Sequence, residues 1–174
     1  MTMLFVDETK AKGYTMVAAV VVPGDANGLR KEMRGLVLKG QRRIHFTSES
    51  DSRRRLILSR LVELEVRAHI VQSTANKQAE GREECLMQLL DLAAENDYTR
   101  LVLERDASIE QADRRILYRE VSSRGLRDSL VYDHMGSHDE PLLWIADAIA
   151  WSHAKGGDWR RRVEPMLFAD VPAG

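Results

Sequence analysis

The chain has 174 residues, of which 44% are hydrophobic and 30% charged, enough for one compact domain with a substantial core. A formal net charge of −1 gives no bulk attraction to nucleic acid, and the single cysteine excludes an internal disulfide or a cysteine-based zinc cluster. The first residues, "MTMLFV", have neither the basic region nor the long apolar stretch that is typical of a secretion signal, and no apolar run in the sequence is long enough to span a bilayer. We therefore expect a single cytoplasmic domain over residues 1–174, with no membrane partner.

In chain order, the sequence begins with two strands. Residues 3–7 and 14–22 are apolar and rich in β-branched residues, and the polar stretch around Gly13 between them is typical of a hairpin. Asp25 is then a candidate N-cap of a helix whose apolar stripe stops at Gly40. The next expected elements are a short strand over 42–46 ("RRIHF") and a helix over 51–63.

From residue 66 onward, predicted strands and helices alternate. The strands cover residues 66–73, 99–104 and 129–134, and the helices cover 79–95, 108–122, 140–154 and a short segment at 159–166. An antiparallel start followed by this alternation is typical of an α/β domain with a mixed sheet flanked by helices. We expect about five or six strands, the first two antiparallel.

Three acidic residues in apolar surroundings are the strongest functional signal. Asp7 ends the first strand, Glu104 ends another, and Asp147 is the only charged residue in "LLWIADAIAW". Burying an unpaired carboxylate is costly, so such acids are normally ion-paired, protonated or bound to a cation. Carboxylates converging from two strand ends and a helix would suit Mg²⁺ or Mn²⁺, because these cations prefer oxygen ligands.

Each acid also has a structural explanation. Asp7 could open a turn through its side chain, and Glu104 could pair with a surface arginine. Asp147 could form a buried salt bridge with an arginine. Each explanation stays open for its own residue, whereas the combination of the three favours a shared site.

The two ends of the chain together resemble one protein family. "FVDET" and "LLWIADAIAW" resemble the motifs "YIDESG" and "LQLADLIA" of an uncharacterised domain-of-unknown-function family of proposed nucleases, a branch of the ribonuclease H-like superfamily. The resemblance implies a single ribonuclease H-like α/β domain, with a mixed sheet flanked by helices and acidic residues that bind Mg²⁺ or Mn²⁺.

Carried onto this sequence, the resemblance makes three acids both catalytic residues and metal ligands. Asp7 and Asp147 match the acids of the two motifs, and Glu104 stands where the family more often has Asp. The sequence departs from the motifs at Thr9-Lys10, which replaces Ser-Gly, and at Trp144, which replaces Gln. The indole would narrow the site or adapt it to a particular substrate.

The implied chemistry is hydrolysis of phosphodiester bonds in nucleic acid, either DNA or RNA, with metal-bound water as the nucleophile. Candidates for a fourth carboxylate are Glu8, Asp106 and Asp139. Candidates for substrate contact are Arg42, Arg43, His45 and His134. The arginines would hold the phosphate backbone without reading its sequence.

A module without catalysis is the main alternative. A ribonuclease H-like domain could bind nucleic acid or a protein partner and keep its acids for structure, and metal dependence would separate the two functions. The motifs of α/β-hydrolases, P-loop proteins and dinucleotide-binding proteins are missing, and Cys85 is expected inside a helix, where a nucleophile is unlikely to be exposed. The apolar helix surface is also compatible with a homodimer.

Overall fold

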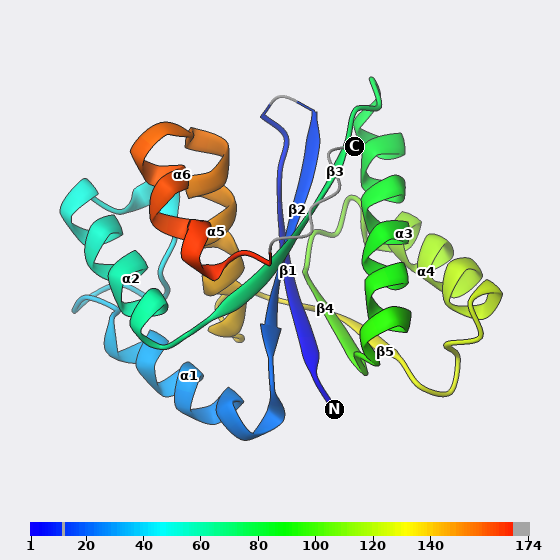
Figure 1. Cartoon of the computed structure of the whole chain (residues 1–174), viewed down its shortest axis with the longest axis horizontal. Helices are drawn as coiled ribbons and strands as arrows, with labels where there is room; N and C mark the ends of the chain where they lie inside the picture. Colours follow the sequence, from blue (N-terminus) through cyan, green and yellow to red (C-terminus); the bar gives the residue numbers. More distant parts are fainter. Residues whose placement is uncertain (12, 169–174) are drawn as a thin grey trace.

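The computed structural model describes residues 1–11 and 13–168 as one α/β domain built on a mixed sheet (Figure 1). Five strands lie in the order β3–β2–β1–β4–β5. They are β1 (Met3–Thr9), β2 (Tyr14–Val21), β3 (Arg67–Ser73), β4 (Arg100–Glu104) and β5 (Val131–Met135). β2 is antiparallel to β1 and β3, whereas β4 is parallel to both β1 and β5. The predicted antiparallel start is confirmed.

Helices cover both faces of this sheet (Figure 1). One face carries α1 (Pro23–Gly35), α2 (Asp51–Glu63), α5 (Leu142–Lys155) and α6 (Gly157–Val163). The other carries α3 (Gln78–Asn96) and α4 (Glu110–Ser123). Two short 3₁₀ helices, η1 (Phe46–Ser48) and η2 (Glu164–Met166), complete the described elements. None of the described helices has the length and apolar character needed to cross a membrane.

The alternation of side chains along β1 divides the hydrophobic core into two layers. Phe5 packs in the layer under α5, whereas Leu4 and Val6 pack in the layer under α3. Cys85 belongs to the second layer, where burial raises the pKa of its thiol to about 11. This thiol is therefore inert, as its helical position predicted.

The strand predicted over residues 42–46 is wrong. Ile44 and Phe46 are fully buried, which mimics a strand, but the backbone here joins no sheet and passes into η1. Side chains bind the main chain instead: the Phe46 amide donates to Asp147, and the Phe46 carbonyl accepts from Arg54. With its hydrogen bonds satisfied in this way, the segment does not need a neighbouring strand.

The first helix also differs from the prediction at both ends. It begins at Pro23, with Val22 at the N-cap position, so Asp25 lies in the first turn. Proline suits the first helical position because its missing N–H would have no partner there. The helix ends at Gly35, before the predicted end at Gly40.

The chain beyond η2 returns to the edge of the sheet. Leu167 forms a parallel bridge with Ala68 of β3, and the Phe168 amide donates to the Ala68 carbonyl over 3.1 Å. The Phe168 ring stacks on His69, with ring centroids 4.3 Å apart. Residues 167–168 therefore pair with an edge strand that the sheet itself leaves open on one side.

Close contact between α3 and β2 generates a prediction about stability. A Cβ atom at Gly81 of α3 would lie 2.7 Å from the Tyr14 Cβ, whereas one at Gly28 of α1 would meet nothing within 4 Å. We expect Gly81→Ala to lower the free energy of unfolding by about 1–3 kcal/mol through overpacking. The matched Gly28→Ala should raise it by up to about 1 kcal/mol, because alanine favours helix.

Urea unfolding of both variants measures these changes. Equal stabilisation by the two substitutions would show that α3 can move away from β2 without loss, contrary to the close packing described here.

Candidate functional site

Strand alternation points two of the predicted acids to the same face of the sheet. Phe5 and Val102, two residues before Asp7 and Glu104, both pack in the layer under α5. β1 and β4 are adjacent and parallel, and Val6 is the register partner of Leu103, so Asp7 and Glu104 come next on the two strands. Glu104 ends β4, but Asp7 does not end its strand as the sequence predicted, because β1 continues to Thr9 along β2. α5, which packs across β1 and β2, contributes Asp147 to this face.

The carboxylates influence one another electrostatically. Burial raises the pKa of Asp7 well above its usual value, and the negative charges of Asp147, Glu8 and Glu104 raise it further. The Glu8 amide donates a hydrogen bond of 2.8 Å to Asp7 Oδ1, and this bond lowers the pKa of Asp7. Within the described part of the chain, Asp7 forms no ion pair, so it is a half-buried acid without a cationic partner.

Arg43 supplies positive charge to the other two acids. Its guanidinium lies 3.5 Å from Glu104 Oε1 and 4.0 Å from Asp147 Oδ2. Asp147 Oδ2 also accepts a hydrogen bond of 2.8 Å from the Phe46 amide. The segment between α1 and α2 is thus attached to the acids through both a side chain and a backbone amide. We call Asp7, Glu104, Asp147 and Arg43 the acid cluster.

Trp144, where the sequence departs from the family motif, supports this cluster indirectly. The indole is only 2% exposed, and its N–H donates to the Ser137 carbonyl. The Ser137 hydroxyl in turn donates to Glu104 Oε1. The tryptophan therefore fixes the loop before α5, and this loop holds Glu104 in place.

The donor atoms of the cluster match a hard divalent cation, although the side chains are not gathered around one point. No three His, Cys, Asp or Glu side chains among residues 1–11 and 13–168 are grouped closely enough to hold a metal ion. The cluster nevertheless offers carboxylate oxygens, the donors preferred by Mg²⁺ and Mn²⁺, and the unpaired Asp7 lacks the cation that would offset its burial. The oxygen donors are of the kind that such an ion prefers, whereas Arg43 already offsets part of the negative charge of Glu104 and Asp147.

The other sequence candidates lie in several places. Asp106 is exposed, and hydrogen bonds from the Ser108 hydroxyl and amide lower its pKa. Asp139 is exposed in the loop before α5. Arg42 and His45 are exposed on the same segment that carries Arg43. These last two residues are open to a ligand beside the acid cluster.

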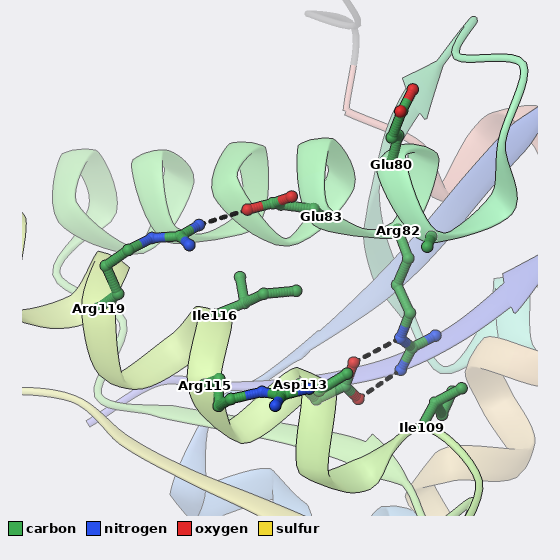
Figure 2. Close-up of a pocket in the computed structure, with 10 residues that line it drawn as sticks. Glu80, Arg82, Glu83, Ile109, Asp113, Arg115, Ile116 and Arg119 are labelled. Carbon is green, nitrogen blue, oxygen red and sulfur yellow. Dashed lines mark hydrogen bonds and ion pairs between the residues drawn. The ribbon is translucent and has the colours of Figure 1, made fainter.

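Glu8 and His134 belong to the opposite face of the sheet. Glu8 lies 3.6 Å from Arg82 of α3, and His134 Nε2 lies 3.0 Å from Asp113 of α4. Arg82 binds Asp113 through two hydrogen bonds of 2.7 and 2.8 Å and donates a third, of 2.8 Å, to the Tyr14 hydroxyl. Figure 2 shows the paired Arg82 and Asp113 at one end of a groove of about 390 Å³ between α3 and α4.

Sequence reasoning missed this buried ion pair, although one signal for it was present. Asp113 shares a helical stripe with the buried Leu117 and Val121, so it is an acid on an apolar face, as Asp147 is. Arg82 similarly precedes the buried Cys85 and Leu86 by helical spacing. A charged residue on an apolar stripe therefore marked both of these sites.

The buried pair predicts a large loss of stability when one partner is removed. Asp113→Asn removes the hydrogen-bonded carboxylate of the buried Arg82 and leaves only the more distant Glu8, which should cost up to about 3–5 kcal/mol. The matched control is Asp91→Asn, because Asp91 binds Arg124 at the surface and its loss should cost less than about 1 kcal/mol. Urea unfolding of both variants tests the difference, and comparable small losses would contradict it.

The raised pKa of Asp7 predicts how stability depends on pH. Between the ordinary pKa of Asp and the raised one, the folded protein binds more protons than the unfolded chain, so stability falls as pH rises. Asp7→Asn removes this loss. Without divalent metal at pH 7, we expect the variant to melt a few degrees above wild type, since about 1 kcal/mol shifts the melting temperature by about 2–4 °C.

The advantage of Asp7→Asn should shrink as the pH falls toward about 4. Asp106→Asn is the control of opposite sign, because the lowered pKa of Asp106 adds stability that is present above its unfolded pKa and lost as pH falls. A lower melting temperature for Asp7→Asn at pH 7 would show that the carboxylate of Asp7 stabilises the metal-free fold.

Comparison with known proteins assigns no family to the chain. A scan against protein-family models found no match, and a search of curated proteins found no significant relative.

Proposed function

We propose that this protein is a divalent-metal-dependent nuclease with a ribonuclease H-like fold. The observation that supports it is that Asp7 of β1, Glu104 at the end of the adjacent β4 and Asp147 of α5 lie on one face of the sheet, where Arg43 contacts Glu104 and Asp147 and the charges of both acids raise the pKa of Asp7. A buried acid made harder to ionise by other acids is a common feature of functional sites. The mixed five-strand sheet with helices on both faces is compatible with the fold that the sequence motifs imply.

In this proposal, Asp7, Glu104 and Asp147 would hold Mg²⁺ or Mn²⁺. The ion would supply Lewis acidity toward a phosphodiester and a water of lowered pKa. Arg43 contributes a guanidinium beside the same acids, and such a group binds phosphate oxygens well. Arg42 and His45 are exposed on the same segment, where they would contact the phosphate backbone on either side.

A second candidate function is a binding module without catalysis, and the position of Arg43 favours it. The guanidinium contacts Glu104 and Asp147 at once, so two of the three acids have a protein cation close by. In this function, the acids serve to anchor the segment between α1 and α2. The same exposed cations would then bind nucleic acid or an acidic partner without cutting it.

Replacing Asp147 tests which function holds. Asp147→Asn keeps the side-chain volume and an oxygen that can accept from the Phe46 amide, but it removes the negative charge needed by a metal. We expect this variant to fold and to lose at least about a hundredfold in cleavage of labelled DNA or RNA, because a metal ion contributes several kcal/mol to the transition state. Single- and double-stranded substrates are assayed with Mg²⁺, Mn²⁺ or EDTA.

Asp133→Asn is the matched control, because Asp133 lies on β5 and pairs with Arg100 outside the acid cluster. Its cleavage rate should equal that of wild type. Melting temperatures with and without Mn²⁺ give a second readout, since a bound ion raises the stability of the folded state. If wild type cuts no substrate and Mn²⁺ leaves its melting temperature unchanged, the nuclease proposal is rejected in favour of the binding module.

A further inference from the structure

We propose that Trp151 and Trp159, with Arg54 and Arg162 against their rings, form a stacking platform for the bases of single-stranded nucleic acid. We call these four residues the tryptophan platform. The inference rests on the proposed function and narrows it, because it names single strands as the substrate class of the acid cluster.

The platform is continuous with the acid cluster. Trp151 follows Asp147 by four residues on α5, so the two side chains share a helix face about 6 Å apart along the axis. Phe46, whose amide donates to Asp147, packs its ring edge against Trp151 with centroids 5.5 Å apart. Because the Arg54 guanidinium lies over one face of Trp151, a base would stack on Trp159, whose ring contacts Trp151.

The rings of the platform form an ordered series of contacts. Trp151 and Trp159 meet edge to face, with centroids 5.4 Å apart and planes at 79°. The Arg54 guanidinium lies 4.1 Å from the Trp151 centroid, and that of Arg162 lies 5.9 Å from the Trp159 centroid. Arg54 is held by the carbonyl groups of Phe46 and Thr47. These contacts fix the aromatic surface before any ligand arrives.

Exposure distinguishes this pair from the third tryptophan. Trp144 is 2% exposed and donates its N–H to a carbonyl of the protein, which is the usual state of a core indole. Trp151 and Trp159 pack only partly against the core and keep part of their surface in water. Large aromatic rings that stay accessible beside a charged site are typical of nucleobase recognition.

The surrounding charge has the sign that a phosphate backbone needs. Residues 152–168 hold four cationic side chains, Lys155, Arg160, Arg161 and Arg162, against two acidic ones, Asp158 and Glu164. The chain as a whole has a net charge of −1, so this segment is locally enriched in positive charge. Arg160 and Arg161 are exposed, where they can contact phosphates while bases stack on the rings.

Accessible aromatic rings next to positive charge favour single strands over duplexes. In a duplex, the faces of the bases are stacked inside the helix, so aromatic rings at the protein surface cannot reach them. An unpaired base exposes its whole face and gains about 1–3 kcal/mol by stacking on an aromatic side chain. Stacking does not depend strongly on base identity, so DNA and RNA strands are both suitable ligands.

Binding without cleavage tests the platform. In EDTA, the affinity of wild type for labelled oligothymidylate, oligouridylate and a blunt duplex of the same length is measured by fluorescence anisotropy. We expect single strands to bind at least about tenfold more tightly than the duplex and to quench the intrinsic tryptophan fluorescence. Trp159→Ala should weaken single-strand binding about tenfold, and Trp159→Phe should recover most of the loss.

Tyr118→Ala is the matched control. Tyr118 is 61% exposed on α4, across the sheet, and the Arg127 guanidinium lies 5.8 Å from its ring centroid. It is thus an aromatic residue beside an arginine at a distance from the acid cluster, and its replacement should leave affinity unchanged. Melting temperatures of every variant confirm that each one is folded.

The outcomes separate this inference from the nuclease proposal. Unchanged affinity of folded Trp159→Ala, equal binding of duplex and single strand, or a ligand that proves to be a protein would each overturn the platform, even if wild type cuts nucleic acid. Tryptophan-dependent binding of single strands by a protein that cuts nothing would support the platform and reject the nuclease.

Discussion

The packing of α5 across β1 and β2 is the constraint on which the candidate site depends. The helix is apolar nearly all round, and nine of its residues are buried, so its position on the sheet is fixed by the core rather than by the acids. This fixed position brings Asp147 to the face that also carries Asp7. The free energy of hydrophobic packing therefore holds together carboxylates that would separate in water.

Charged residues on the two faces of the sheet differ in how they are paired. On the face of α3 and α4, Arg82 and Asp113 bind one another through two hydrogen bonds. Among the described residues, Nδ1 of His134, which is bound to Asp113 through Nε2, is the one buried side-chain nitrogen or oxygen without a hydrogen-bond partner. On the face of α5, Asp7 has no cationic partner within the described part of the chain. Asp7 thus differs from Arg82 and Asp113 in having no ion pair, whereas Glu104 and Asp147 on the same face are close to Arg43.

Much of the fold could be predicted from the sequence because its main elements depend on local patterns. The helix over 51–63 and the strands around residues 3–9 and 14–21 follow from the spacing of apolar residues. The segment 42–46 could not be assigned in this way, because burial of Ile44 and Phe46 looks the same in a strand and in a coil. Its conformation depends on Asp147, a residue 101 positions later than Phe46.

The candidate site likewise includes residues that the sequence alone reveals and residues whose role depends on the tertiary fold. Asp7 and Asp147 each stand out as an acid in an apolar setting, so single residues were enough to find them. Arg43 was one of several clustered arginines, and its contact with two acids depends on how a loop between two helices folds back. Arg82 and Asp113 each lie on an apolar helical stripe, but the sequence does not show that the two residues pair, because the sheet brings their helices together.

The pairing of residues 167–168 with β3 affects how readily copies of the protein aggregate through their sheet edges. An open edge strand can template pairing with another chain, and β3 is the longer of the two edge strands of this sheet. Leu167 and Phe168 take up backbone positions at that edge, and the Phe168 ring covers His69. The opposite edge is the short strand β5, which carries the charged Asp133 in its centre. The chain thus discourages edge-to-edge aggregation by occupying the start of its longer edge with its own backbone and keeping the other edge short and charged.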